Sequence, residues 1–239
     1  MALVHGKVQR TLPSATADAG VAPMRVDSFG SPIVVPLGWG THAIVDEGSY
    51  WKAINPTPGT AIAQSIVAAF TTTDAVFLLR NADASKRYYM DYLRIINNVA
   101  PANATRSEGL IAIDSSSRYS SGGSSLTPVN PNMASAATTS AVCRFGALTL
   151  GAESGNVRRV SRFQLRTAIA VVYEEWLFTF GRLDMGGFNT LSGTNGQRQQ
   201  VDCGPVIIGP SNDLIVHLWH PGNSATAATW EFEAGWYER

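Results

Sequence analysis

The sequence predicts an all-β protein that folds as a single antiparallel β-sandwich of the jelly-roll kind, with an extended N-terminal arm. Several segments alternate between apolar and polar residues with a period of two, which is the pattern of half-buried strands. Turn residues separate these segments at short intervals, as in a sandwich or jelly roll. No long segment combines helical periodicity with caps at both ends.

The N-terminal part of the chain predicts an arm and then the first strands. Residues 1–20, with Pro13 and many Ala and Thr, are expected to be extended, and residues 21–239 to form one domain. The segment "MRVDSFGSPIVVPL" indicates two short strands around residues 29–32. "IVAAFTTTDAVFLLRN" indicates a hairpin that turns at residues 72–74.

The middle of the chain continues the strand pattern. The periodicity of "RYYMDYLRIINN" fits a helix or a strand, but its aromatic and β-branched residues favour a strand. Further strands are expected at "EGLIAID", "AVCRFGALTL", "RRVSRFQLR" and "DCGPVII". About ten short strands result, which is the spacing of a sandwich or jelly roll.

The C-terminal third carries the clearest alternation. In "EEWLFTF" and "ATWEFEAGWY" one face of each strand is apolar, and Glu231 and Glu233 lie on the opposite, solvent-facing side. These apolar faces contain Trp176, Phe178, Phe180, Trp230, Phe232, Ala234 and Trp236. "LIVHLW" is apolar on both faces, so we expect a central strand that is covered on both sides.

The segment "SSSRYSSGGSSLTPVNPN", residues 115–132, admits three interpretations: a phosphate-binding loop, a linker between domains, or an ordered loop. A phosphate-binding loop needs a Lys and a following helix, which Pro128 and Pro131 forbid. Strand signals continue on both sides without a shift in composition, which disfavours a linker. We therefore expect an ordered surface loop in which Gly122 and Gly123 allow a tight reversal.

Composition limits the classes of partner. The formal net charge is zero, so no global basic field attracts nucleic acid or an anionic membrane. Charged residues make up only 15% of the chain. The free-energy cost of removing water from such a surface is low, which favours contacts with other proteins. Without an apolar span or an export signal at the start, we expect a soluble protein made in the cytoplasm, with Cys143 and Cys203 as buried free thiols.

The residues that could carry chemistry form no recognisable constellation. The G-x-S-x-G motif of a nucleophilic serine is absent from the sequence. His217 and His220 are three apart on one strand and point to opposite faces, so they do not clamp one metal ion from that strand. Glu174 and Glu175 also point apart, and no glycosidase pair stands out. We expect no enzymatic activity, no cofactor and no metal.

Basic residues provide the candidate contacts with partners. In "RRVSRFQLR", Arg158, Arg162 and Arg166 fall on one strand face, either as a solvated stripe or as a contact for an acidic partner surface. Arg118 and Tyr119, in the segment of residues 115–132, are further candidates for such a contact.

Segments from about residue 21 to the C-terminus resemble a family of uncharacterised virion proteins of tailed bacteriophages. They include "DEGSYWKAINPTPGTAIA", "RYSSGGSSLTPVN", "PVIIGPSNDLIVHLW" and "EFEAGWYER". The resemblance implies a virion structural protein, namely a jelly-roll capsid decoration (cement) protein. Because jelly rolls on virus surfaces commonly assemble as symmetric trimers, we expect a homotrimer that binds the outer capsid surface, contacts the major capsid protein and other virion proteins, and stabilises the shell. The resemblance implies no catalytic or cofactor residues.

Two alternatives to a decoration protein remain from the sequence. One is a tail, baseplate or head-fibre component that recognises a host surface glycan, with Trp39, Tyr50, Trp51 and Trp219 as a platform for sugar rings. The other is a hydrolase of cell-wall or capsule polymer, which the missing catalytic constellation disfavours.

Overall fold

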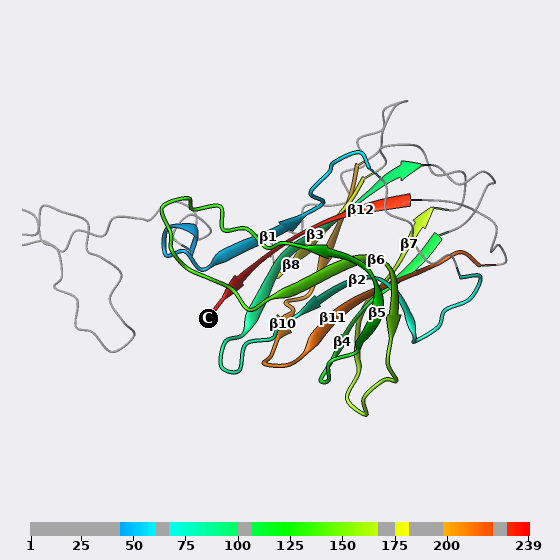
Figure 1. Ribbon diagram of the computed structural model, residues 1–239. Coiled ribbons are helices and arrows are strands. Elements are labelled where there is room, and N and C mark those ends of the chain that lie inside the picture. Colours follow the sequence, from blue (N-terminus) through cyan, green and yellow to red (C-terminus); the bar gives the residue numbers. More distant parts are fainter. Residues whose placement is uncertain (1–43, 61–66, 100–106, 167–174, 182–197, 222–228) are drawn as a thin grey trace, which may run out of the picture.

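The computed structural model describes residues 44–60, 67–99, 107–166, 175–181, 198–221 and 229–239, which form two β-sheets packed face to face (Figure 1). Sheet I has the strand order β1-β12-β3-β8-β9, and β10 also pairs with β3. Its strands are β1 (Tyr50–Ile54), β3 (Tyr88–Val99), β8 (Glu175–Phe180), β9 (Arg198–Cys203), β10 (Ile207–Ile208) and β12 (Thr229–Glu238). Its pairings are antiparallel except for that of β8 with β9.

Sheet II has the strand order β5-β6-β2-β11-β4-β7 and is antiparallel throughout. Its strands are β2 (Asp74–Arg80), β4 (Ser107–Asp114), β5 (Tyr119–Leu126), β6 (Val142–Leu150), β7 (Arg158–Arg166) and β11 (Asp213–Trp219). Together the sheets confirm the prediction of an all-β sandwich. The proposed arm of residues 1–20 lies outside the described residues.

Eight of the strands follow the jelly-roll connection. Along the chain, β1, β3, β8 and β12 belong to sheet I, and β2, β4, β7 and β11 belong to sheet II, so the chain crosses repeatedly between the layers. The strands β5 and β6 extend sheet II beyond β2, while β9 and β10 extend sheet I beside β8 and β3. The edge strands are thus β1 and β9 in sheet I and β5 and β7 in sheet II.

Aromatic side chains join the two sheets across the core. Phe232 of β12 stacks on Phe77 of β2, with ring centroids 5.6 Å apart, and meets the edge of Phe145 of β6 at 6.4 Å. Phe163 of β7 and Phe178 of β8 lie 4.5 Å apart. These contacts bury large apolar surfaces from both layers, which is the main source of stability in a sandwich.

The strongest sequence patterns are confirmed. The apolar faces predicted for the two C-terminal segments are buried in β8 and β12. Every residue of β11 is buried, as expected for a central strand covered on both sides. The solvent-facing placement of Glu231 is wrong: the residue is 7% exposed, and its carboxylate accepts hydrogen bonds from the backbone of Gly59 and from Asn98.

Two local predictions fail or fall outside the structure. Residues 67–73 form no strand, so the hairpin expected before β2 is a single strand preceded by an irregular segment. Phe70 in this segment packs on the outer face of sheet II, 5.3 Å from the rings of both His217 and Trp219. The strands expected around residues 29–32 lie outside the described residues.

The segment of residues 115–132 is the largest local correction. Gly122 and Gly123 do not reverse the chain, because strand β5 runs through both of them and pairs with β6. Their φ angles of 83° and 66° lie in the left-handed region, and the pairing shifts its register between Gly122 and Ser124. The two glycines therefore form a β-bulge in an edge strand.

Substituting Gly122 with alanine is expected to destabilise the protein by about 1–3 kcal/mol. A β-carbon at this position would lie 2.3 Å from the carbonyl oxygen of Ala147, and the φ of 83° disfavours any side chain. The free energy of unfolding in urea measures the effect. Gly204→Ala is the matched control, since a β-carbon there would meet no atom within 4 Å and its φ is not left-handed.

Part of the outer face of sheet II is buried. Ala75, Leu78, Leu148, Leu150 and Ile215 form a second apolar cluster there. Polar side chains from the neighbouring loops complete the cover, as described below. Within the described ranges, no helix has the length and apolar character that crossing a bilayer requires.

Candidate functional site

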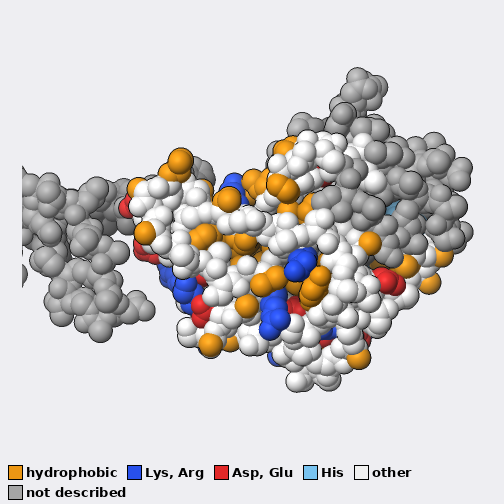
Figure 2. Space-filling model, viewed as in Figure 1, with side chains coloured by type: hydrophobic (Ala, Val, Ile, Leu, Met, Phe, Trp, Pro, Cys, Tyr) orange, Lys and Arg blue, Asp and Glu red, His pale blue; other side chains and the backbone are white. Residues whose placement is uncertain are grey.

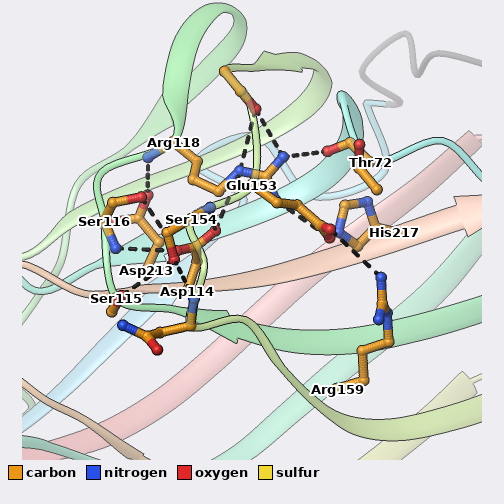
Figure 3. A network of polar contacts seen from close by, with 12 residues as sticks. Thr72, Asp114, Ser115, Ser116, Arg118, Glu153, Ser154, Arg159, Asp213 and His217 are labelled. Carbon is orange, nitrogen blue, oxygen red and sulfur yellow. Dashed lines mark hydrogen bonds and ion pairs between the residues drawn. The ribbon is translucent and has the colours of Figure 1, made fainter.

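A network of polar contacts centred on Arg118 lies on the outer face of sheet II (Figure 3). The side chains of Arg118 and Asp114 are fully buried, and Arg118 Nε lies 3.5 Å from Asp114 Oδ2. The guanidinium also donates to the carbonyl oxygen of Gly151 at 2.8 Å and to that of Thr72. The backbone N–H of Arg118 donates to Asp213 Oδ2 at 2.7 Å. Arg118 therefore forms an ion pair with Asp114 and donates hydrogen bonds to three other acceptors through its guanidinium and its backbone N–H.

The two aspartates of this network are placed side by side by the pairing of β4 with β11, in which Asp114 faces Asp213. Burial raises the pKa of Asp213 to about 6, although hydrogen bonding to the backbone of Arg118 opposes the rise. Burial alone would also raise the pKa of Asp114, but hydrogen bonds from Ser154 and Ser116 outweigh it and lower this pKa. Asp114 thus carries the negative charge beside Arg118, while Asp213 titrates near pH 6.

Asp213→Asn is expected to gain stability relative to the wild type as the pH rises. The folded wild type binds the Asp213 proton more tightly than the unfolded chain does, so this contribution is full below pH 3.8 and is lost as the pH rises through 6. The difference between these two pKa values corresponds to about 3 kcal/mol. Urea unfolding at pH 4 and pH 7 measures the change. A difference between the two proteins that stays constant with pH would contradict the titration of Asp213.

The burial of Arg118 corrects one predicted partner contact. Its side chain is enclosed by the protein and does not reach a surface that a partner could touch. Tyr119 is partly buried and packs against the second apolar cluster. The guanidinium carbon of Arg144 lies 4.2 Å from its ring centroid, and its hydroxyl donates to the carbonyl oxygen of Gly122 at 3.0 Å. Tyr119 therefore fastens β5 to sheet II.

The predicted arginine stripe on β7 is interrupted by a bulge. The pairing of β4 with β7 shifts its register, so that Arg158 pairs with Ile113 and Arg162 pairs with Leu110. Positions 110 and 113 lie on opposite faces of β4, so the side chains of Arg158 and Arg162 also lie on opposite faces. The side chain of Arg166 lies outside the described part of the structure. A single basic face containing all three arginines is therefore wrong.

The buried histidines have structural partners. His217 Nδ1 lies 2.7 Å from the carbonyl oxygen of Asp74, to which it donates, and His220 Nδ1 lies 2.9 Å from Ser107 Oγ. Burial lowers the pKa of both histidines, so they are neutral at pH 7. Among the described residues, no group of three or more potential ligands is arranged to hold a metal ion.

Carboxylates on the outer face of sheet I are engaged by a cation from the same sheet. Arg94 on β3 lies 2.8 Å from Glu175 of β8 and 3.1 Å from Glu233 of β12. The hydroxyl of Tyr92 also donates to Glu233. Burial and the neighbouring Glu233 raise the pKa of Tyr92, so its hydroxyl stays protonated. This cluster stabilises the pairing of β3 with β8 and β12. Glu175 and Glu233 are both held in ion pairs with Arg94, so neither carboxylate is placed to act as a general base.

The aromatic residues expected to form a sugar platform are interior. Tyr50, Trp51 and Trp219 are 3%, 5% and 8% exposed, so these three do not offer their faces to a ligand. Trp39 lies outside the described residues. The predicted glycan platform is thus wrong for the three residues that the structure describes.

The two cysteines are free thiols. Cys143 is buried in the core, as expected, while Cys203 at the end of β9 is only partly buried. Burial raises the pKa of both thiols, which lowers the fraction of reactive thiolate. Neither cysteine is therefore suited to act as a nucleophile at neutral pH.

An open groove of about 940 Å³ lies at one end of the sandwich, among the connections between strands. Arg87 from the β2–β3 connection and Arg158 from β7 line it, together with Ile113 of β4 and Ile207 of β10. Ile207 is 46% exposed, which is unusual for a large aliphatic side chain. We call this feature the Arg87–Arg158 groove.

A second, smaller groove of about 290 Å³ lies on the other side of the sandwich, between β1 and β5. Ile54, which is 42% exposed, and Val129, which is 49% exposed, line it. The backbone of Val129 pairs with that of Lys52, so the groove has a fixed wall. Both grooves combine exposed aliphatic residues with polar neighbours, as protein contact surfaces do.

The rest of the visible surface is weakly charged. Figure 2 shows scattered hydrophobic, basic and acidic patches separated by uncharged polar surface. Comparison with protein-family models, with curated proteins and with solved structures found no match.

Proposed function

We propose that the protein is a non-enzymatic structural component of a bacteriophage virion, a decoration or cement protein that binds the outer capsid surface as a homotrimer. The observation that carries this proposal is the placement of exposed aliphatic residues. Among the described residues, large hydrophobic side chains are exposed in both grooves and in the β5–β6 connection, at Ile54, Val129, Met133 and Ile207. Such positions on two sides of one sandwich suit a subunit with more than one neighbour.

The chemistry of the interior supports the same proposal. The buried cation Arg118 lies beside Asp114, its backbone N–H donates to Asp213, and the ion pairs around Arg94 tie strands together. These groups hold the fold together. The jelly roll and the low charge of the chain add support, because few ions must lose water when such a surface enters an interface.

A decoration protein acts through contact area and not through a reaction. An interface of standard size buries roughly 1,600 Å² in total. A trimer that touches the shell at several points multiplies weak contacts into strong retention, because each further contact forms within one assembly. A shell that swells or is pressurised must then break these contacts together.

Purified particles of the phage that encodes the chain provide the test. Mass spectrometry should find the polypeptide in particles that have been washed and banded by density. Light scattering on the isolated protein should give three times the subunit mass of 25.5 kDa. Absence from the particles would overturn the virion assignment, and presence on isolated tails alone would favour a tail or fibre component that recognises a host glycan.

A further inference from the structure

We propose that the Arg87–Arg158 groove binds an extended acidic segment of a partner polypeptide. This inference rests on the proposed function in one respect only, that the partner is a protein. The groove brings together side chains from connections that are far apart in the sequence. It also offers three kinds of contact at once: cations, exposed aliphatic surface and free strand edges.

The cations of the groove lack acidic partners in the described structure. No described carboxylate forms an ion pair with Arg87 or Arg158, whereas the nearby Arg159 lies 3.5 Å from Glu153. Glu238, which pairs across the strands with the residue that follows Arg87, instead lies 3.2 Å from Lys86. Two guanidinium groups facing one groove favour carboxylates, which they bind in bidentate geometry.

The groove also lies between two strand edges. Among the described strands, β10 pairs only with β3 and β7 pairs only with β4. The remaining edge of β7 carries backbone N–H and C=O groups that an added strand can use. β10 offers less, because it has two residues and the carbonyl oxygen of Ile208 accepts a hydrogen bond from Asn81. Ile207 and Arg158 lie on these two strands and both line the groove, so an extended segment within it meets backbone as well as side chains.

The aliphatic side chains predict the pattern of the ligand. Ile113, Val157 and Ile207 line the groove beside the two arginines. Successive side chains of an extended segment point to opposite sides, so a segment that alternates acidic and aliphatic residues matches both walls. No aromatic side chain is found among the described residues that line the groove, so it lacks the stacking surface that sugar rings use. A polypeptide therefore fits better than a glycan.

Fluorescence anisotropy with the isolated full chain tests this proposal. The probe is a fluorescein-labelled peptide of about eight residues that alternates Asp and Val, and the comparison peptide alternates Lys and Val. We expect the acidic peptide to bind and the basic peptide not to bind. The double variant Arg87→Gln/Arg158→Gln should weaken binding by about tenfold, the loss expected for two charge-assisted contacts.

Arg159→Gln is the matched control, because it removes the same charge one residue from Arg158 but on the face that bears Glu153. Its affinity for the acidic peptide should stay within about twofold of the wild type. Circular dichroism and thermal unfolding should show that all variants fold, since these arginines are exposed. Equal binding by the double variant and the wild type would overturn the proposal.

Two further probes separate the kinds of ligand. A peptide N-methylated at alternate residues should bind more weakly, because it cannot donate to a strand edge, and unchanged binding would contradict strand addition. An oligogalacturonate that binds more tightly than the peptide would contradict a polypeptide partner. These measurements use the isolated protein, so their failure is distinguishable from absence of the chain from virions.

Discussion

Replacing Arg118 with methionine is expected to lower the free energy of unfolding by about 3–5 kcal/mol. Methionine keeps the apolar part of the side chain but removes the cation that faces Asp114. It also leaves the carbonyl oxygens of Gly151 and Thr72 without their donor. A buried charge without a partner costs far more than a buried pair contributes, so the loss should be large. Urea unfolding at pH 7 measures it.

Arg159→Met is the control for this substitution. The side chain of Arg159 is 55% exposed and its contact with Glu153 is at the surface, so the free energy of unfolding should change by less than about 0.5 kcal/mol. A loss below about 1 kcal/mol for Arg118→Met would show that the network is not important for stability. Function would then be the simpler reason for a buried arginine among acids.

Phe232→Ala is expected to cost about 3–5 kcal/mol as well. The ring of Phe232 is 1% exposed and contacts Phe77 and Phe145, which both belong to the opposite sheet. Its removal leaves a cavity between the layers that neighbouring side chains on rigid strands cannot fill. Thermal and urea unfolding measure the loss.

Ile54→Ala is the control for the core substitution, because Ile54 is 42% exposed and the change removes similar chemistry from the surface. It should cost less than about 1 kcal/mol. A small effect of Phe232→Ala, equal to that of Ile54→Ala, would contradict the packing of the two sheets through Phe232.

Strands that are covered by other elements could be predicted from the sequence. β8 and β12 each bury one complete face, and β11 is buried throughout, so the hydrophobic pattern of each reports its burial directly. β5 has no such pattern, because six of its eight residues are exposed. It is a strand because its backbone pairs with β6. Backbone pairing in an exposed edge strand does not require alternating apolar and polar side chains, so the sequence shows no periodicity there.

The role of Arg118 could not be predicted because most of its partners are distant in sequence, although Asp114 is only four positions away. Asp213 is 95 positions further along the chain. An arginine among Ser and Gly residues is most simply exposed, and only the closure of β4 against β11 brings two aspartates to it. The bulge on β7 could not be predicted either, because a side-chain period of two assumes a regular strand. The predicted stripe of arginines therefore joined residues that lie on opposite faces.

The Arg87–Arg158 groove illustrates the same limit for function. Arg87, Arg158 and Ile207 come from three separate parts of the chain, and none lies in a motif. The signal that sequence reasoning can use is indirect: "RRVSRFQLR" is the one dense basic segment, and one of its arginines does line the groove. The bulge in β7 decides that this arginine is Arg158 and not Arg162.

A reconstruction of the purified phage particle by electron cryomicroscopy tests whether this jelly roll decorates a capsid. We predict trimers of a β-sandwich on the outer surface of the shell, with the edges that carry Ile54 and Ile207 turned toward neighbouring subunits. Density for the sandwich only on the tail or its fibres, or a complete absence of it from the particle, would show that the protein is not a capsid decoration protein.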